Sequence, residues 1–233
     1  MKILAIDSSG MVASVAVAED DTLLGEYTIH HKKTHSQTLL PMIDEVVRML
    51  ELDLSAVDAI AVAAGPGSFT GLRIGSATAK GLCMALDKPL VAVPTVDALA
   101  YNLAGCGVLV CPLMDARRNQ VYTGLYRFEG SQMHAVLDQC AVGIDEIVAR
   151  MNEYGQAVTF LGDGVRVSAP YIQEHCSVPY TFAPAHLNKQ RASAVAVLAM
   201  EYYSKGMVQT AAEHRPEYLR MSQAERERME RQR

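Results

Sequence analysis

Two turns in this chain each place an aspartate at the end of an apolar strand. Asp7-Ser8-Ser9-Gly10 follows Ile-Leu-Ala-Ile, and its hydroxyl and glycine donors beside a carboxylate suit a nucleotide phosphate. The turn at 115–120 carries two arginines, which are poorly suited to a close backbone wrap around phosphate. A lone Asp at a strand end is more often a turn former than a ligand. The sequence is compatible with weak nucleotide binding at six residues: Asp7, Ser8, Ser9, Gly162, Asp163 and Gly164.

A glycine-rich segment at 65–75 reads GPGSFTGLRIG. It lacks the lysine of a P-loop, and its third glycine falls one place late for G-x-G-x-x-G. It nevertheless reads as a strand, a tight turn and a helix start, so its free amides could receive an anion. The favoured interpretation is packing, because small residues at helical spacing let another helix approach closely. These are Gly71, Gly75, Thr78, Ala79 and Leu82.

Two histidines at i and i+4, His31 and His35, would share one face of a helix and could bind zinc with a third ligand. A capping-box pattern at 34–37 starts the helix at Thr34, which leaves His31 outside it. The better interpretation is therefore a basic surface loop that leads into a capped helix. No catalytic triad or reactive-cysteine context is visible either, so we predict no metal site and no catalytic residue.

The elements that position these residues follow from hydrophobic periodicity. Strands are predicted at 2–7, 12–17, 23–29, 56–64 and 90–93, with an amphipathic helix after Thr34 that contains Pro41 and a second helix ending near Leu86. Later elements are strands at 111–114, 121–125 and 157–161, with helices at 144–152 and 192–203.

The second half repeats the plan of the first when Asp115 is aligned with Asp7. Each aspartate then lies between an apolar strand and its return strand. Chance can produce two such hairpins, but the alternative is a duplicated α/β fold of two similar domains facing each other across a cleft, as in actin. We predict domains at 1–104 and 105–221, with the last helix free to pack back on the first domain, and a charged, disordered or frayed tail at 222–233.

Composition excludes several function classes. The chain has 233 residues and a net charge of −5, so it has no net positive charge to attract the phosphate backbone of nucleic acid. With no Trp and 4 Phe, it also has few aromatic side chains on which bases could stack. The longest nearly uncharged run, 103–114, is too short to cross a bilayer, so we expect a cytoplasmic protein with no membrane contact. Its 5 Cys form no C-x-x-C pair and read as reduced core residues.

Taken together, five segments resemble the TsaB family, also called YeaZ: 3–9, 34–41, 65–75, 114–122 and 216–220. The resemblance covers nearly the whole chain and implies an actin-like (ribonuclease H-like) fold of two duplicated domains with mixed sheets. It also implies a place in the machinery that installs N6-threonylcarbamoyladenosine beside the tRNA anticodon. The implied role is a non-catalytic subunit that holds the enzyme TsaD, with TsaE as a further partner. It implies no cofactor of its own, ATP or ADP acting only in the complex, and tRNA contact only through the complex.

The resemblance further implies that the helices starting at Thr34 and Thr70 form the TsaD-binding surface, which self-associates to a homodimer when TsaD is absent. The residues it marks are His35, Leu39, Ile43, Gly71, Leu72, Arg73, Gly75, Thr78, Ala79 and Leu82. The chain departs from the family pattern at 118–120, where Arg-Asn-Gln stands in place of Gly-Glu. The alternative function is a weak nucleotide-binding or peptidase-like enzyme.

Overall fold

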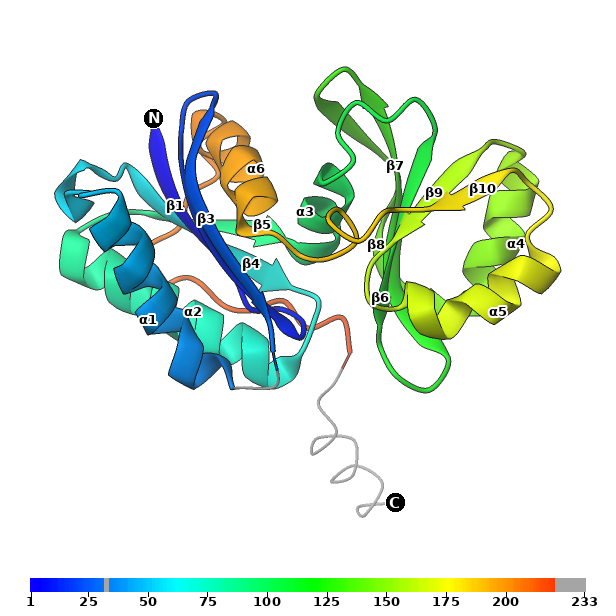
Figure 1. The fold of residues 1–233 in the computed structure, drawn as a ribbon, viewed down its shortest axis with the longest axis horizontal. Coiled ribbons are helices and arrows are strands. Elements are labelled where there is room, and N and C mark those ends of the chain that lie inside the picture. The colour runs from blue at the N-terminus through cyan, green and yellow to red at the C-terminus, as the bar shows by residue number, and fades with distance from the viewer. Residues whose placement is uncertain (32–33, 221–233) are drawn as a thin grey trace, which may run out of the picture.

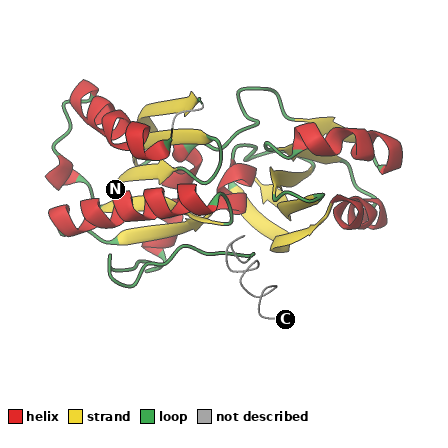
Figure 2. Ribbon diagram, turned by 90° about the horizontal axis from the view of Figure 1, so that it is seen from below, coloured by secondary structure: helices red, strands yellow, loops and turns green. Residues whose placement is uncertain are grey.

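A computed structural model describes residues 1–31 and 34–220. The molecule has two lobes, each built on a five-stranded sheet with helices on its faces (Figure 1; Figure 2). The predicted tail at 222–233 lies outside the described residues. So do two residues of the predicted basic loop, Lys32 and Lys33.

The first sheet has the order β3-β2-β1-β4-β5. Its strands are β1 (Lys2–Asp7), β2 (Val12–Glu19), β3 (Thr22–His30), β4 (Ala59–Gly65) and β5 (Leu90–Pro94). β1 pairs antiparallel with β2 and parallel with β4, which is buried along its whole length. The predicted strand at 56–64 begins only at Ala59, because Leu54–Ala56 forms a short 3-10 helix, η1.

Helices cover both faces of this sheet. α1 (His35–Met49) and α2 (Phe69–Leu86) pack on one face through an apolar cluster, and α6 (Ala192–Ser204) packs on the other against β1 and β2. α1 begins after Thr34 as predicted, and Pro41 lies inside it. The capping box is wrong, since the Thr34 side chain makes no capping hydrogen bond among the described residues.

The second sheet has the order β10-β9-β6-β7-β8. Its strands are β6 (Leu109–Asp115), β7 (Gln120–Glu129), β8 (Gln132–Gly143), β9 (Val158–Leu161) and β10 (Tyr180–Phe182), with α4 (Ile144–Tyr154) and α5 (Val165–His175) packed on it. β6 pairs antiparallel with β7 and parallel with β9, so β6–β10 repeat the connectivity of β1–β5. The duplicated α/β fold is confirmed, although the sequence did not reveal β8, α5, β10 or the short helix α3 (Thr95–Tyr101) that leads into the second lobe.

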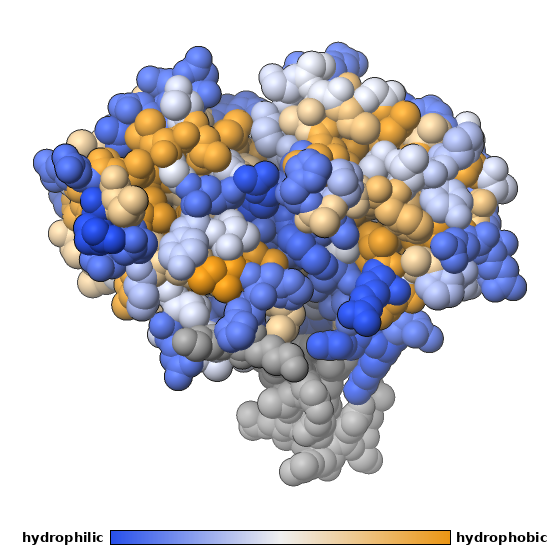
Figure 3. Space-filling model, viewed as in Figure 1, coloured by the Kyte–Doolittle hydropathy of each residue, from blue (hydrophilic) through white to orange (hydrophobic). Residues whose placement is uncertain are grey.

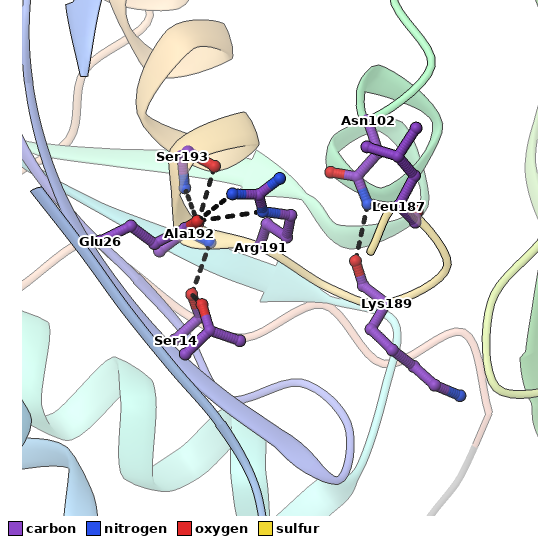
Figure 4. A network of polar contacts seen from close by, with 9 residues as sticks. Ser14, Glu26, Asn102, Leu187, Lys189, Arg191, Ala192 and Ser193 are labelled. Carbon is purple, nitrogen blue, oxygen red and sulfur yellow. Dashed lines mark hydrogen bonds and ion pairs between the residues drawn. The ribbon is translucent and has the colours of Figure 1, made fainter. Parts of the chain in front are cut away.

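Two chain segments join the lobes, and polar contacts fix both (Figure 4). Asn102, at the end of α3, donates to the carbonyl oxygens of Leu187 and Lys189 at 3.1 and 2.6 Å. Where the chain re-enters the first lobe, Glu26 of β3 pairs with the Arg191 guanidinium and accepts from the Ser193 amide at 3.0 Å. Glu26 thus caps the N-terminus of α6, and these bonds lower the pKa of its carboxyl against the opposing effect of burial.

None of the five cysteines forms a disulfide. Within the described ranges, no helix is long and apolar enough to span a bilayer.

Candidate partner-binding surface and interdomain cleft

The glycine-rich segment packs against the first aspartate turn, and this packing sets the rotation of α2. The Ser68 hydroxyl caps α2 by accepting from the Gly71 amide at 3.3 Å. A Cβ added at Gly71 would overlap the Ser8 carbonyl oxygen, and one at Gly75 would overlap the Ser8 hydroxyl and lie 3.6 Å from a Val62 methyl. The small residues therefore let α2 approach this chain's own β1–β2 turn.

The predicted outward face of α2 is accordingly wrong at four positions: Gly71, Leu72, Gly75 and Ala79, which are buried within the lobe. On α1, Leu39 and Ile43 are also buried in the core. Buried side chains of this kind cannot present themselves to a partner without unfolding the lobe.

The other four predicted interface residues reach solvent. Arg73 is exposed, whereas His35, Thr78 and Leu82 are half-buried. His35 is held in place because its Nε2 lies 2.8 Å from the Gly10 carbonyl oxygen.

A second stripe of small residues, which sequence reasoning passed over, faces outward on α2. It consists of Ala77, Gly81 and Ala85, all exposed, and a Cβ at Gly81 would meet no described atom within 4 Å. On α1, which contacts α2, Leu40 is 58% exposed. An exposed leucine on a neighbouring helix, together with a shallow strip of glycine and alanine, is a surface that another helix can approach closely.

In the interdomain cleft, the Asp7 carboxyl is buried at the end of β1. Its Oδ1 accepts from the Ser9 amide at 2.9 Å and the Ser9 hydroxyl at 2.6 Å, while its Oδ2 is buried with no described hydrogen-bond partner. Burial raises the pKa of Asp7 to about 6, although the two bonds from Ser9 and the charge of His35 act in the opposite direction. The Ser8 hydroxyl donates to the Gly71 carbonyl at 2.9 Å.

On the opposite wall, the donors of the Gly162-Asp163-Gly164 turn are also used within the chain. The Gly162 amide donates to Asn188 Oδ1 at 2.6 Å, and the Gly164 amide donates to the Leu113 carbonyl at 2.8 Å. Asp163 accepts from the Asp115 amide at 3.2 Å, and burial raises its pKa.

A cavity of about 380 Å³ lies between these turns. The first lobe lines it with Ser9 and Ser68, the second with Asp115 and Arg117, and C-terminal residues 218–220 form a further wall. Figure 3 shows hydrophilic residues gathered between the two lobes. Of the six candidate nucleotide residues, only Ser9 and Asp163 line this cavity. The Ser8 and Ser9 hydroxyls and the amides of Ser9, Gly162 and Gly164 donate to groups within the protein.

The second aspartate turn adopts an unusual backbone. Arg117, Arg118 and Asn119 have φ values of 65°, 58° and 58°, a left-handed conformation that non-glycine residues rarely adopt in succession. Asp115 Oδ1 accepts from the Arg117 amide at 2.7 Å, so Asp115 acts here as a turn former. The arginine side chains project into solvent.

A buried serine–histidine contact was not predicted. The Ser76 hydroxyl lies 3.0 Å from His214 Nε2, and His214 Nδ1 lies 3.1 Å from Gln209 Oε1. Burial, with the nearby charges of Lys80 and Arg215, lowers the pKa of His214 to about 4. Since both Ser76 and His214 are buried, no substrate reaches this pair, and its role is to attach the C-terminal segment to α2. Within 1–31 and 34–220, no three His, Cys, Asp or Glu side chains gather as metal ligands.

Two similar α/β lobes with aspartate turns facing one cleft define a protein of the actin-like ATPase fold. The activator of 2-hydroxyisocaproyl-CoA dehydratase from Clostridium difficile, solved with bound ADPNP, superimposes with a TM-score of 0.51 at 8% identity. The alignment covers 88% of this chain and 97% of that one, and it shows the shared fold alone.

The sequence shows the family. A family model described as TsaD, tRNA N6-adenosine threonylcarbamoyltransferase, matches residues 22–228. The tRNA threonylcarbamoyladenosine biosynthesis protein TsaB of Bacillus subtilis is 33% identical over 97% of this chain and 96% of its own length. The structure of YeaZ from Pseudomonas aeruginosa superimposes with a TM-score of 0.81 at 28% identity, covering 94% of this chain and 99% of that one. The chain belongs to the TsaB (YeaZ) family.

Proposed function

We propose that this chain is a non-catalytic subunit that binds TsaD in the formation of N6-threonylcarbamoyladenosine beside the tRNA anticodon. Family membership supports the pathway. The observation that supports a binding role is the outward stripe of small residues on α2, together with the exposed Leu40 on the neighbouring helix α1. The partner surface consists of Leu40, Arg73, Ala77, Thr78, Gly81, Leu82 and Ala85. This set keeps the two helices that the resemblance implied and rotates the contact to their solvent side.

The chemistry of this surface suits helix-to-helix contact. Alanine and glycine keep the partner's backbone close, and the exposed leucine supplies apolar area whose burial stabilises the complex at about 25 cal/mol per Å². A large charged side chain in the stripe would hold the partner helix away and would have to be desolvated on binding.

Leu40→Arg and Gly81→Arg are each expected to weaken binding to TsaD by about 100-fold or more, which corresponds to about 2.7 kcal/mol. Both positions face solvent, so each variant should keep the wild-type fold, measured by circular dichroism. Isothermal titration of TsaD with each variant measures the effect.

Val167→Arg is the matched control, because Val167 is 64% exposed on α5 of the second lobe. It should bind TsaD like the wild type. Full-strength binding by both Leu40→Arg and Gly81→Arg would show that TsaD docks elsewhere.

We propose that the isolated chain forms a homodimer through the same surface. In the cytoplasm, TsaE joins the TsaD-containing complex. The chain contacts tRNA only within that complex. ATP or ADP acts at the level of the complex. This agrees with a cleft in which several hydrogen-bond donors that could bind phosphate donate to groups of the chain itself. Analytical ultracentrifugation tests the homodimer: wild type should sediment as a dimer and Gly81→Arg as a monomer.

A further inference from the structure

We propose that residues 209–220, here called the C-terminal strap, hold the two lobes in one fixed orientation. Two domains joined by short chain crossings, as in this fold, are expected to move about those crossings as about a hinge. The strap adds a third connection. In Figure 1 it runs below the two crossing segments, from the first lobe toward the second.

The strap is attached to the first lobe along its length. Gln209 and Leu90 exchange two backbone hydrogen bonds of 2.8 Å at the edge of β5. His214 is fully buried, in contact with Ser76, and its carbonyl oxygen accepts from Lys80 Nζ at 3.0 Å. Further on, the Glu217 amide donates to the Ala64 carbonyl at 2.7 Å.

The close passage of the strap explains a glycine in the glycine-rich segment. Gly65 has a φ of 127°, and a Cβ there would overlap the Glu217 carbonyl oxygen. The segment at 65–75 therefore accommodates the strap at one end and the β1–β2 turn at the other.

The end of the strap then contacts the second lobe. The Arg220 guanidinium donates to the carbonyl oxygens of Ala116 and Arg117, so it holds the backbone of the left-handed turn between β6 and β7. Glu217 Oε2 accepts from Gln139 Nε2 of β8 at 3.0 Å. These two side chains tie the β6–β7 turn and β8 to a segment that is itself bound to the first lobe.

Between these attachments, the Tyr218 ring packs against Phe69 at a tilt of 34° and lines the cavity. Its ring centroid lies 4.7 Å from that of Phe69, its hydroxyl accepts from Arg73 Nε at 3.4 Å, and it lines the cavity wall with Arg220. An outward movement of the second lobe would have to break the Arg220 and Gln139 contacts and would expose further the side chain of Tyr218, which is 39% exposed in the fold.

The chain contains no tryptophan, so Tyr218→Trp places a single fluorescent reporter in the strap. In this background, Arg220→Ala with Gln139→Ala removes the side-chain bonds from the strap to the second lobe. We expect acrylamide quenching of the tryptophan to rise at least twofold, and small-angle X-ray scattering to give a larger radius of gyration.

Arg127→Ala in the same background is the matched control. Its guanidinium donates to Gln156 at 2.9 Å, a bond that stays within the second lobe, so both readouts should remain unchanged. Arg220→Lys, which keeps a cationic donor, should restore most of the lost protection when it replaces Arg220→Ala.

Unchanged quenching and an unchanged radius of gyration in a double variant that still folds by circular dichroism would overturn the proposal. If the double variant does not fold, Arg220→Ala alone is measured by the same two readouts, and the same result would contradict the strap's role.

Discussion

Gly71→Ala is expected to lower the free energy of unfolding by about 1–3 kcal/mol, because the added methyl group overlaps the Ser8 carbonyl oxygen. Neither side can yield easily, since one is the first turn of α2 and the other is the backbone of the β1–β2 turn. In a chain of this size, each kcal/mol shifts the melting temperature by about 2–4 °C. Gly75→Ala should also destabilise, because its methyl displaces the Ser8 hydroxyl from Gly71.

Gly81→Ala in the same helix is the matched control. Its methyl meets no described atom, so the higher helix propensity of alanine should stabilise the chain by up to about 1 kcal/mol. Opposite signs for Gly71→Ala and Gly81→Ala in urea unfolding would support the observed rotation of α2. If Gly81→Ala destabilised the chain and Gly71→Ala did not, the face of α2 that carries Gly81 would be the buried one.

Asp7→Asn is expected to stabilise the protein above neutral pH. The pKa of Asp7 is about 6 in the fold against an ordinary value of 3.8, so the folded state binds more protons than the unfolded state between these values. The stability contributed at this site therefore falls as pH rises from about 4 to about 6. The full difference corresponds to about 3 kcal/mol. Asparagine keeps an oxygen that can accept both Ser9 bonds and carries no charge. Its NH2 group would replace Oδ2, which is buried with no described partner, so the net gain in stability should be smaller than the full difference.

Asp53→Asn provides the comparison, because Asp53 on the surface also accepts from the amide and hydroxyl of the serine two residues on, here with Oδ1 and Oδ2 respectively. There the two bonds lower the pKa of the carboxyl, so the substitution should weaken rather than strengthen the fold. Urea midpoints at pH 4 and pH 7.5 measure both effects. A gain for Asp7→Asn that is equally large at pH 4 would show that charge burial is not its cause.

The topology could be predicted from the sequence more fully than the functional site. The aspartate turns and the repeated strand plan were visible because each apolar run ends in a polar turn, and both are confirmed. The rotation of α2 was not predictable, since Gly71, Gly75 and Ala79 on one side and Ala77, Gly81 and Ala85 on the other share the same spacing of four residues. Only the position of the Ser8 turn decides which stripe is buried.

Other features gave weaker signals for physical reasons. β8 is largely half-exposed and has no sustained apolar run, and Pro170 interrupts the pattern of α5. The strap depends on single backbone and side-chain bonds spread over twelve residues, with no periodicity to mark it. The buried Ser76–His214 contact joins positions 138 residues apart, and neither residue has a neighbouring motif that would have indicated it.

We propose that this chain assists TsaD without catalysing a reaction itself. The most direct test of this proposal measures threonylcarbamoyladenosine formation on tRNA, together with ATP hydrolysis, in parallel reactions containing the purified chain alone, TsaD alone, or both, each supplied with TsaE and threonylcarbamoyl-adenylate. We expect modified tRNA only where the chain and TsaD are present together, and we expect Gly81→Arg to lose that activity. Modification or ATP turnover by the chain without TsaD, abolished by Asp7→Ala, would contradict the proposal.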